Sequence, residues 1–111
     1  PYTAYNAKGS YIDNNPAVIE GFTKAIQKGL DYVHSHSAKE VASTISKHFP
    51  DNSISELTDI VQKYMDIDAW YDTTYITEKD FNHIMDIVSS AGKLDKKVPY
   101  KKLVNNSYSE K

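Results

Sequence analysis

The sequence contains no cysteine, no long hydrophobic run and no strong excess of charge. The absence of cysteine excludes a disulfide framework and thiol chemistry, but it leaves the cellular compartment open. No apolar run approaches the roughly 18 residues that a membrane-spanning helix needs. The net charge is −2 and the lysines are spread along the chain, which argues against the clustered cationic surface that nucleic acid requires.

Several motifs of catalysis and metal binding are also missing. The chain has no glycine-rich phosphate loop, no Gly-x-Ser-x-Gly elbow and no His-Glu-x-x-His pattern. His34 and His36 are two residues apart, a spacing that does not place them on one face of a helix. His48 and His83 lack a carboxylate partner at ligand spacing. We interpret the four histidines as surface or helix-end residues and not as metal ligands.

The acidic stretch from Asp66 to Asp72 resembles the start of a calcium loop, but its spacing is wrong. Tyr71 stands where an EF-hand needs glycine, and Thr77 stands where it needs a bidentate glutamate. Asp66 and Asp68 also lack an apolar pocket signal that would raise a pKa for acid–base catalysis. We therefore predict no catalytic residue, no metal and no cofactor, and we expect the chain not to be an enzyme.

Helix signals dominate what is present. The 111 residues, 40% of them hydrophobic and 25% charged, suit one small globular domain. Ser37 with Glu40 and Ser53 with Glu56 are capping boxes, and Gly92 suits a left-handed helix end. With apolar residues at helical spacing, these signals predict four helices in the region 15–92. Their expected ranges are 15–34, 37–49, 53–66 and 77–92.

The first of these helices carries an unusual face. Asn15 and Pro16 give it a favourable start. Gly21, Ala25 and Gly29 then fall four residues apart and stack on one side. Each glycine inside a helix costs about 1 kcal/mol relative to alanine. We expect close packing against a neighbour to offset that cost, and we leave open whether the neighbour lies within the 111 residues.

Both ends of the chain are expected to differ from the helical region. Residues 2–5 favour a short strand, followed by a turn at 8–10, although no later segment offers a ladder partner. In the tail, 93–111, Pro99 can begin a short helical turn and the last seven residues are expected to fray. The predicted class is mainly α, with four helices plus a short N-terminal strand.

Aromatic residues are the candidate binding groups. Trp70, Tyr71 and Tyr75 stand close together in a loop and could stack on a planar ligand. The alternative is that these rings cover the ends of the third and fourth helices. Two interpretations also apply to Tyr2, Thr3 and Tyr5: they are side chains of an edge strand, or they face a ligand-binding cleft.

Six motifs, in this order and spacing, resemble a known family. They are Pro-Tyr-Thr-Ala-Tyr at 1–5, Asn-Pro-Ala-Val-Ile-Glu-Gly-Phe-Thr-Lys-Ala at 15–25, His-Phe-Pro at 48–50, Trp70 before Ile-Thr-Glu at 76–78, Ala-Gly-Lys-Leu at 91–94 and Val-Pro-Tyr-Lys-Lys-Leu-Val at 98–104. The set is similar to the C-terminal part of ABC-transporter substrate-binding proteins of the NMT1/THI5-like group. That group includes binders of nitrate, aliphatic sulfonates, taurine and pyrimidine precursors of thiamine.

The resemblance covers residues 1–111 and implies a segment of a two-lobed type II periplasmic-binding-protein α/β fold. It implies that residues 1–11 cross between the lobes, that 15–92 form the four-helix region and that 93–111 form the tail. Tyr2, Thr3, Tyr5 and Trp70 are then the candidate ligand-binding residues. The first lobe, most of the second lobe and any export signal would lie outside the chain, which begins without Met or a basic n-region.

The implied function is that of an extracytoplasmic receptor, periplasmic or lipid-anchored, for an ABC importer. Its partners would be a small anionic or heterocyclic solute, a membrane permease, and either the N-terminal part of the same protein or a second copy. One alternative is a thiamine-pyrimidine synthase-like enzyme of the same fold. Another is a self-contained helical interaction domain, which would pack Gly21, Ala25 and Gly29 within its own chain.

Overall fold

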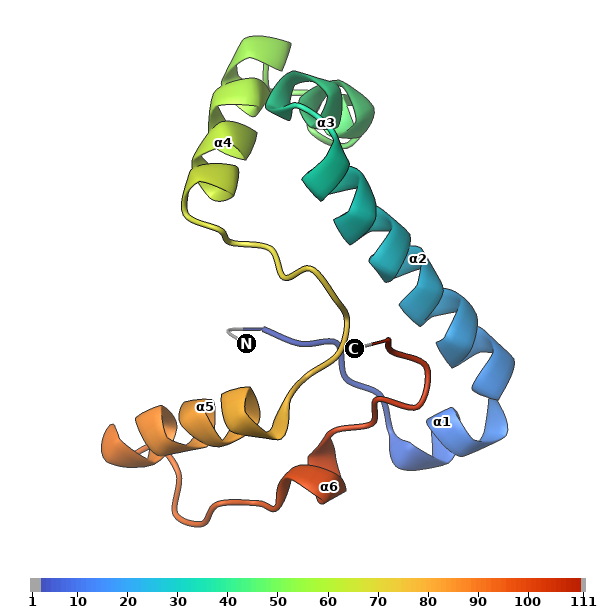
Figure 1. Ribbon diagram of the computed structural model, residues 1–111, viewed down its shortest axis with the longest axis vertical. Coiled ribbons are helices and arrows are strands. Elements are labelled where there is room, and N and C mark those ends of the chain that lie inside the picture. The colour runs from blue at the N-terminus through green and yellow to red at the C-terminus, as the bar shows by residue number, and fades with distance from the viewer. Residues whose placement is uncertain (1–2, 111) are drawn as a thin grey trace. The chain divides into compact units, whose positions relative to one another are not determined.

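The computed structural model describes residues 3–110, which form helices joined by loops (Figure 1). The chain divides into two compact units, and each is described by itself. The first comprises Pro1–Thr23 and Thr74–Lys111, and the second comprises Lys24–Thr73. The elements in chain order are α1 (Gly9–Asn14), α2 (Pro16–Ser35), α3 (Ala38–Ile45), the short 3₁₀ helix η1 (Ser46–His48), α4 (Ile54–Asp66), α5 (Glu78–Ser90) and α6 (Tyr100–Leu103).

The predicted N-terminal strand is wrong. Residues 3–7 have no regular structure, and no strand forms anywhere between residues 3 and 110. A strand needs a neighbouring strand to pair its backbone groups, and this chain supplies none. Instead, the N–H groups of Tyr11 and Ile12 donate to the Lys8 carbonyl at 2.9 and 3.1 Å. The predicted turn at 8–10 is therefore the start of α1. All regular structure in residues 3–110 is helical, which fits the mainly α class predicted for this segment without its strand.

The four predicted helices are found as α2, α3, α4 and α5. The second of them is shorter than expected, because α3 ends at Ile45 and the chain continues as η1 to His48. Phe49 then leaves the helical region, with φ −131° and ψ 62°. The following Pro50 explains this, since its ring disfavours helical backbone in the residue before it.

Local side-chain caps begin α3, α4 and α5 where the sequence predicted. Ser37 forms a full capping box with Glu40, and Ser53 forms one with Glu56. The Thr77 hydroxyl accepts a hydrogen bond from the Asp80 N–H at 3.1 Å, at the start of α5. After α5, Gly92 has φ +67°, which confirms the left-handed position predicted for it.

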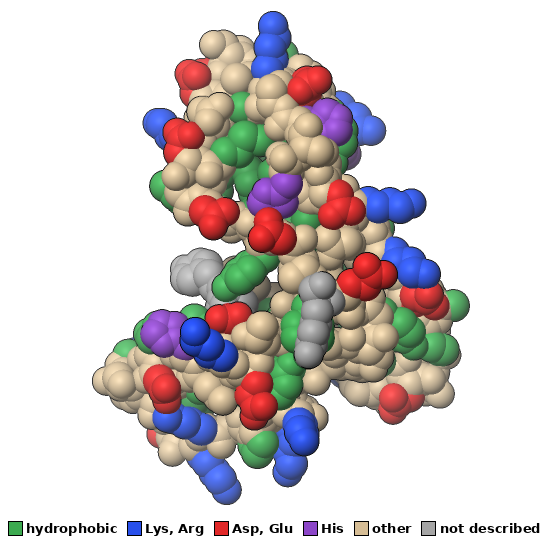
Figure 2. All heavy atoms as spheres, in the orientation of Figure 1, with side chains coloured by type: hydrophobic (Ala, Val, Ile, Leu, Met, Phe, Trp, Pro, Cys, Tyr) green, Lys and Arg blue, Asp and Glu red, His purple; other side chains and the backbone are tan. Residues whose placement is uncertain are grey.

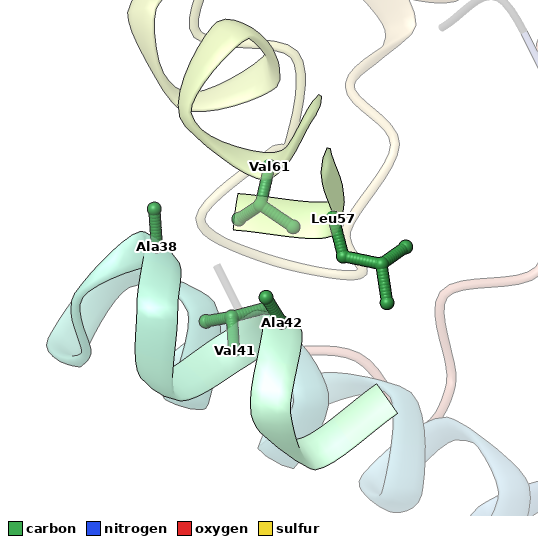
Figure 3. Packing of buried hydrophobic residues seen from close by; sticks show 5 residues of the cluster. All are labelled: Ala38, Val41, Ala42, Leu57 and Val61. Carbon is green, nitrogen blue, oxygen red and sulfur yellow. The ribbon is translucent and has the colours of Figure 1, made fainter. Parts of the chain in front are cut away.

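A small hydrophobic core holds the second unit together. Ala38, Val41 and Ala42 of α3 face Leu57 and Val61 of α4 (Figure 3). Ala42 is completely buried, with 0% of its surface exposed. Its small side chain lets the two helices approach closely. The half-buried hydrophobic residues that pack against this core are Tyr32, Val33, Ile45, Met65 and Trp70.

Hydrogen bonds organise the first unit, where the tail returns to the start of α5. The Asn106 side chain accepts a hydrogen bond from the Ile76 N–H at 3.1 Å and donates to the Ile76 carbonyl at 2.9 Å. The Tyr100 hydroxyl donates to the same carbonyl at 2.6 Å, and its ring meets the buried Phe81 edge-to-face. Ser109 donates to the Thr74 carbonyl at 3.3 Å. The polar tail, which was expected to fray, is thus bonded to the loop before α5.

We predict that Asn106→Ala destabilises the first unit, whereas Asn105→Ala does not. Asn106→Ala leaves the half-buried Ile76 amide without its side-chain acceptor, which should cost about 1–3 kcal/mol. Asn105 accepts only an exposed hydrogen bond from the Ser107 N–H, so its loss should change stability by less than about 0.5 kcal/mol. Hydrogen exchange at the Ile76 amide, together with urea unfolding, measures both effects. Equal effects of the two variants would contradict the assigned role of Asn106.

The two capping boxes also predict acid sensitivity. Hydrogen bonds from Ser37 lower the pKa of Glu40 below its ordinary 4.5, and the backbone N–H and hydroxyl of Ser53 lower the pKa of Glu56 in the same way. Because the folded state holds these protons less tightly, the stabilisation is complete above the ordinary pKa. It is lost as pH falls through the lowered folded values.

We therefore expect the second unit to melt at a lower temperature at about pH 3 than at pH 7. The double variant Glu40→Gln and Glu56→Gln should show a smaller difference, since glutamine can keep the capping geometry without a charge. The pH dependence of the double variant is compared with that of the unmodified chain. Both proteins keep Asp86 in the first unit, whose pKa is also lowered by a hydrogen bond from Lys97. Circular dichroism melts at the two pH values measure the difference, and an unchanged pH dependence in the double variant would argue against this origin.

Candidate functional site

The loop after α4 turns back towards that helix and places Trp70 on it. Asp68 adopts φ +51°, a left-handed conformation that aspartate tolerates better than most residues. The Ala69 N–H then donates to the Tyr64 carbonyl at 3.0 Å. As a result the Trp70 ring stacks on the Tyr64 ring, with centroids 5.5 Å apart and planes inclined by 25°. This reversal brings the only tryptophan of the chain into the second unit's candidate site.

Trp70 helps to line an apolar hollow of about 380 Å³ within the second unit, which we call the α2–α3 groove. The lining residues come from α2, α3 and the loop: Ala25, Ile26, Gly29, Leu30, Tyr32, Val33, Val41, Thr44, Ile45 and Trp70. The hydroxyls of Tyr32 and Thr44 lie 2.9 Å apart and hydrogen-bond to each other. The groove can therefore receive an apolar or aromatic surface without leaving these two polar groups unpaired.

The small residues of α2 form an open wall of this groove. Gly21, Ala25 and Gly29 are all exposed, and the last two line the groove. A Cβ added at Gly21 or Gly29 would meet nothing within 4 Å. Within its own unit, neither glycine has a close contact that requires the missing side chain, so the neighbour expected for this face stays a prediction.

A second, polar hollow of about 230 Å³ lies beside Trp70 and is lined by Asp68, Trp70, Tyr71 and Asp72. Contacts with α2 hold this part of the loop. The Gln27 side chain donates to the Asp72 carbonyl at 2.8 Å, and His34 Nε2 lies 3.5 Å from an Asp72 carboxylate oxygen. Within the described part of the chain, no three His, Asp or Glu side chains are grouped in a way that could hold a metal ion.

The structure places the predicted binding residues in different units. Tyr5, in the first unit, is 75% exposed and meets the Phe22 ring edge-to-face at 4.8 Å. Thr3, also in the first unit, is exposed. Trp70 is half-buried in the second unit, and Tyr2 lies outside the described residues. The assignment of these four residues to ligand binding stays a prediction.

Sequence reasoning found two parts of the α2–α3 groove but did not join them. The small-residue face of α2 and Trp70 were each identified from the pattern. Their meeting depends on the turn at Asp68 and on the contacts of Tyr32, Val33 and Trp70 with the α3–α4 core. The missed lining residues Ile45 and Thr44 carry no signal beyond ordinary helix periodicity. Hydrophobic side chains also reach the surface at several other places on the face drawn in Figure 2.

Comparison with known proteins gives one informative match. No family model matches the chain. No solved structure matches it either. The chain is 32% identical over 111 residues, 100% of its length, to a Bacillus subtilis (strain 168) protein named "Putative binding protein YtlA". It covers 33% of that protein, so it spans about a third of the length of the curated relative it matches. The similarity supports a binding role and names neither ligand nor partner.

No helix between residues 3 and 110 is both long enough and apolar enough to cross a bilayer.

We predict that Tyr64 controls the environment of Trp70. Tyr64→Ala removes the stacked ring, so Trp70 fluorescence should shift to longer wavelength and become more accessible to acrylamide. Tyr64→Phe keeps a ring and should leave both properties nearly unchanged. Tyr71→Ala is the matched control, because Tyr71 is the neighbour of Trp70 in the chain and its side chain is largely exposed. A larger change in Tyr71→Ala than in Tyr64→Ala would contradict the stacking.

Proposed function

We propose that this chain is the C-terminal segment of an extracytoplasmic solute-binding receptor of an ABC importer, of the NMT1/THI5-like group. The observation that carries the proposal is the match along the entire chain to a binding protein about three times as long. The ordered motifs from residue 1 to residue 104 support the same group. The receptor would bind a small anionic or heterocyclic solute and present it to a membrane permease.

In this proposal the protein is a binder and not an enzyme. The α2–α3 groove supports a binding role, because it is lined mainly by aliphatic and aromatic side chains and by two hydroxyls that bond to each other. Such a surface can hold a partner by burial and stacking. A receptor for an importer acts outside the cytoplasm, so we place the whole protein in the periplasm or on a lipid anchor at the cell surface.

The starts of α3, α4 and α5 are unfavourable for an anionic solute, whereas the first turn of α2 contains no acidic residue. An anion such as nitrate or a sulfonate binds well at the N-terminus of a helix, where backbone N–H groups point outwards. At α3 and α4 those positions are already taken by the carboxylates of Glu40 and Glu56, and Asp80 lies in the first turn of α5. A second anion there would meet a like charge. The stacked Trp70–Tyr64 pair, by contrast, offers the aromatic surface that a planar heterocycle prefers.

A thermal-shift screen of the full-length protein tests the proposal. The compounds are pyrimidine precursors of thiamine, taurine and other sulfonates, nitrate and bicarbonate. A ligand at about 100 times its Kd should stabilise the protein by about 2.7 kcal/mol and raise Tm by about 5 °C. We expect a pyrimidine to give this rise. A rise with anions alone would overturn the preference for a heterocycle, and no rise with any compound would count against the receptor assignment.

The predicted site residue Trp70 gives a sharper form of the same test. Trp70→Ala in the full-length protein should reduce the Tm rise with the pyrimidine, and Trp70→Phe should keep most of it, because a ring remains available for stacking. Ile87→Ala is a suitable control, since Ile87 is 51% exposed and lies on α5 in the other unit. An equal rise in the Trp70→Ala protein and the unmodified protein would remove Trp70 from the site.

A further inference from the structure

Two side chains of α2 hold the loop that carries Trp70. The Gln27 side-chain amide donates to the Asp72 carbonyl at 2.8 Å. His34 Nε2 lies 3.2 Å from the Tyr71 carbonyl oxygen. Because Gln27 and His34 are seven residues apart, they lie on the same side of the helix, two turns from each other. They converge on neighbouring carbonyls of the loop, and all of these residues belong to the second unit.

The chemistry of the acceptors fixes which atoms carry the hydrogens. Carbonyl and carboxylate oxygens only accept, so the NH₂ group of Gln27, and not its oxygen, faces the loop. The same nitrogen also donates to an Asp31 carboxylate oxygen at 2.9 Å, one turn along α2. Asp31 therefore holds the amide in the orientation that the loop requires. By the same reasoning His34 Nε2 carries a proton, which faces the Tyr71 carbonyl and an Asp72 carboxylate oxygen 3.5 Å away.

These contacts decide where the Trp70 ring is held. No helix or strand fixes the backbone of residues 67–77. On one side of Trp70, the Ala69 N–H is bonded to the Tyr64 carbonyl. On the other side, the backbone is attached only through side chains of α2. We call these side chains the α2 clamp: Gln27, Asp31 and His34.

We infer that the α2 clamp consists of positioning residues for the solute-binding role: it fixes the loop on α2 and so presets the Trp70 ring for a ligand. The inference rests on the proposed function in taking Trp70 to contact the solute. A ring that is already held in place loses less conformational freedom when a ligand stacks on it. The clamp therefore raises affinity without touching the ligand itself.

Gln27→Glu tests the clamp with almost no change of shape. The new carboxylate cannot donate to the Asp72 carbonyl, and it repels Asp31 one turn away. In the full-length protein without solute, we expect the amides of residues 69–73 to exchange their hydrogens at least about fivefold faster, because the loop opens more often. Gln27→Lys keeps a donor for both oxygens and should restore slow exchange. Hydrogen exchange read by mass spectrometry on the loop peptide measures these rates.

Gln62→Glu is the matched control. Gln62 donates to an Asp66 carboxylate oxygen at 2.8 Å, with the same four-residue spacing but on α4. Within residues 3–110 it makes no hydrogen bond to the loop, so exchange at residues 69–73 should not change. Both glutamines lie on helices of the second unit. Thermal unfolding midpoints of the two variants should agree within about 2 °C, so that faster exchange in Gln27→Glu alone reports a local opening.

Solute affinity separates positioning from a general structural role. The probe is a pyrimidine precursor of thiamine, and its Kd is measured by calorimetry on the full-length protein. Gln27→Glu should weaken binding by about fivefold when Trp70 is present and should have no effect in Trp70→Ala protein, because the clamp acts through the ring. His34→Phe, which keeps a ring but has no donor, should show the same dependence on Trp70.

Two results would overturn the inference. One is unchanged loop exchange in Gln27→Glu, or an equal acceleration in Gln62→Glu. The other is a loss of affinity in Gln27→Glu that persists in Trp70→Ala protein, since the clamp would then act elsewhere. Binding of no solute at all refutes the proposed function and the ligand part of the inference, whereas the exchange rates, measured without solute, still decide whether the clamp holds the loop.

Discussion

The contact between α3 and α4 is the constraint on which the second unit depends. Ala42 is fully buried at its centre, and Tyr32, Val33 and Trp70 pack against its edge. A core built from so few side chains fixes the two helices but cannot cover the neighbouring face of α2. The α2–α3 groove is thus a direct consequence of a small core. Its existence, more than any single polar residue, gives this unit a surface suited to binding.

Side-chain hydrogen bonds hold the loop segments that the small hydrophobic core does not order. In the first unit, Asn106 satisfies both backbone groups of Ile76, which lies in the loop before α5. Desolvation raises the pKa of Tyr100, whose hydroxyl donates to the same carbonyl. In the second unit, Gln27 holds the backbone of Asp72. Side chains from distant positions therefore order segments that have no regular structure.

The binding role and the architecture rest on different observations. The whole-chain similarity to a binding protein supports the role, and it concerns a protein of which this chain spans about a third. The helical structure supplies the groove, the stacked Trp70–Tyr64 pair and the helix starts occupied by Glu40 and Glu56. The strand expected at residues 2–5 has no support from either, since the described residues from 3 onward enter α1 without pairing.

The sequence alone determined the features that act over three or four residues. The capping boxes at Ser37 and Ser53, the left-handed Gly92 and the positions of the four main helices all follow from local hydrogen bonds and helical periodicity. Only the tertiary structure decided that Asn106 bonds to Ile76, thirty positions away, and that Trp70 turns back onto Tyr64 beside the face of Gly29. The physical reason is the separation in sequence between the residues that interact. A cap is complete within one turn of helix, whereas a long-range contact depends on where the whole chain brings its two partners together.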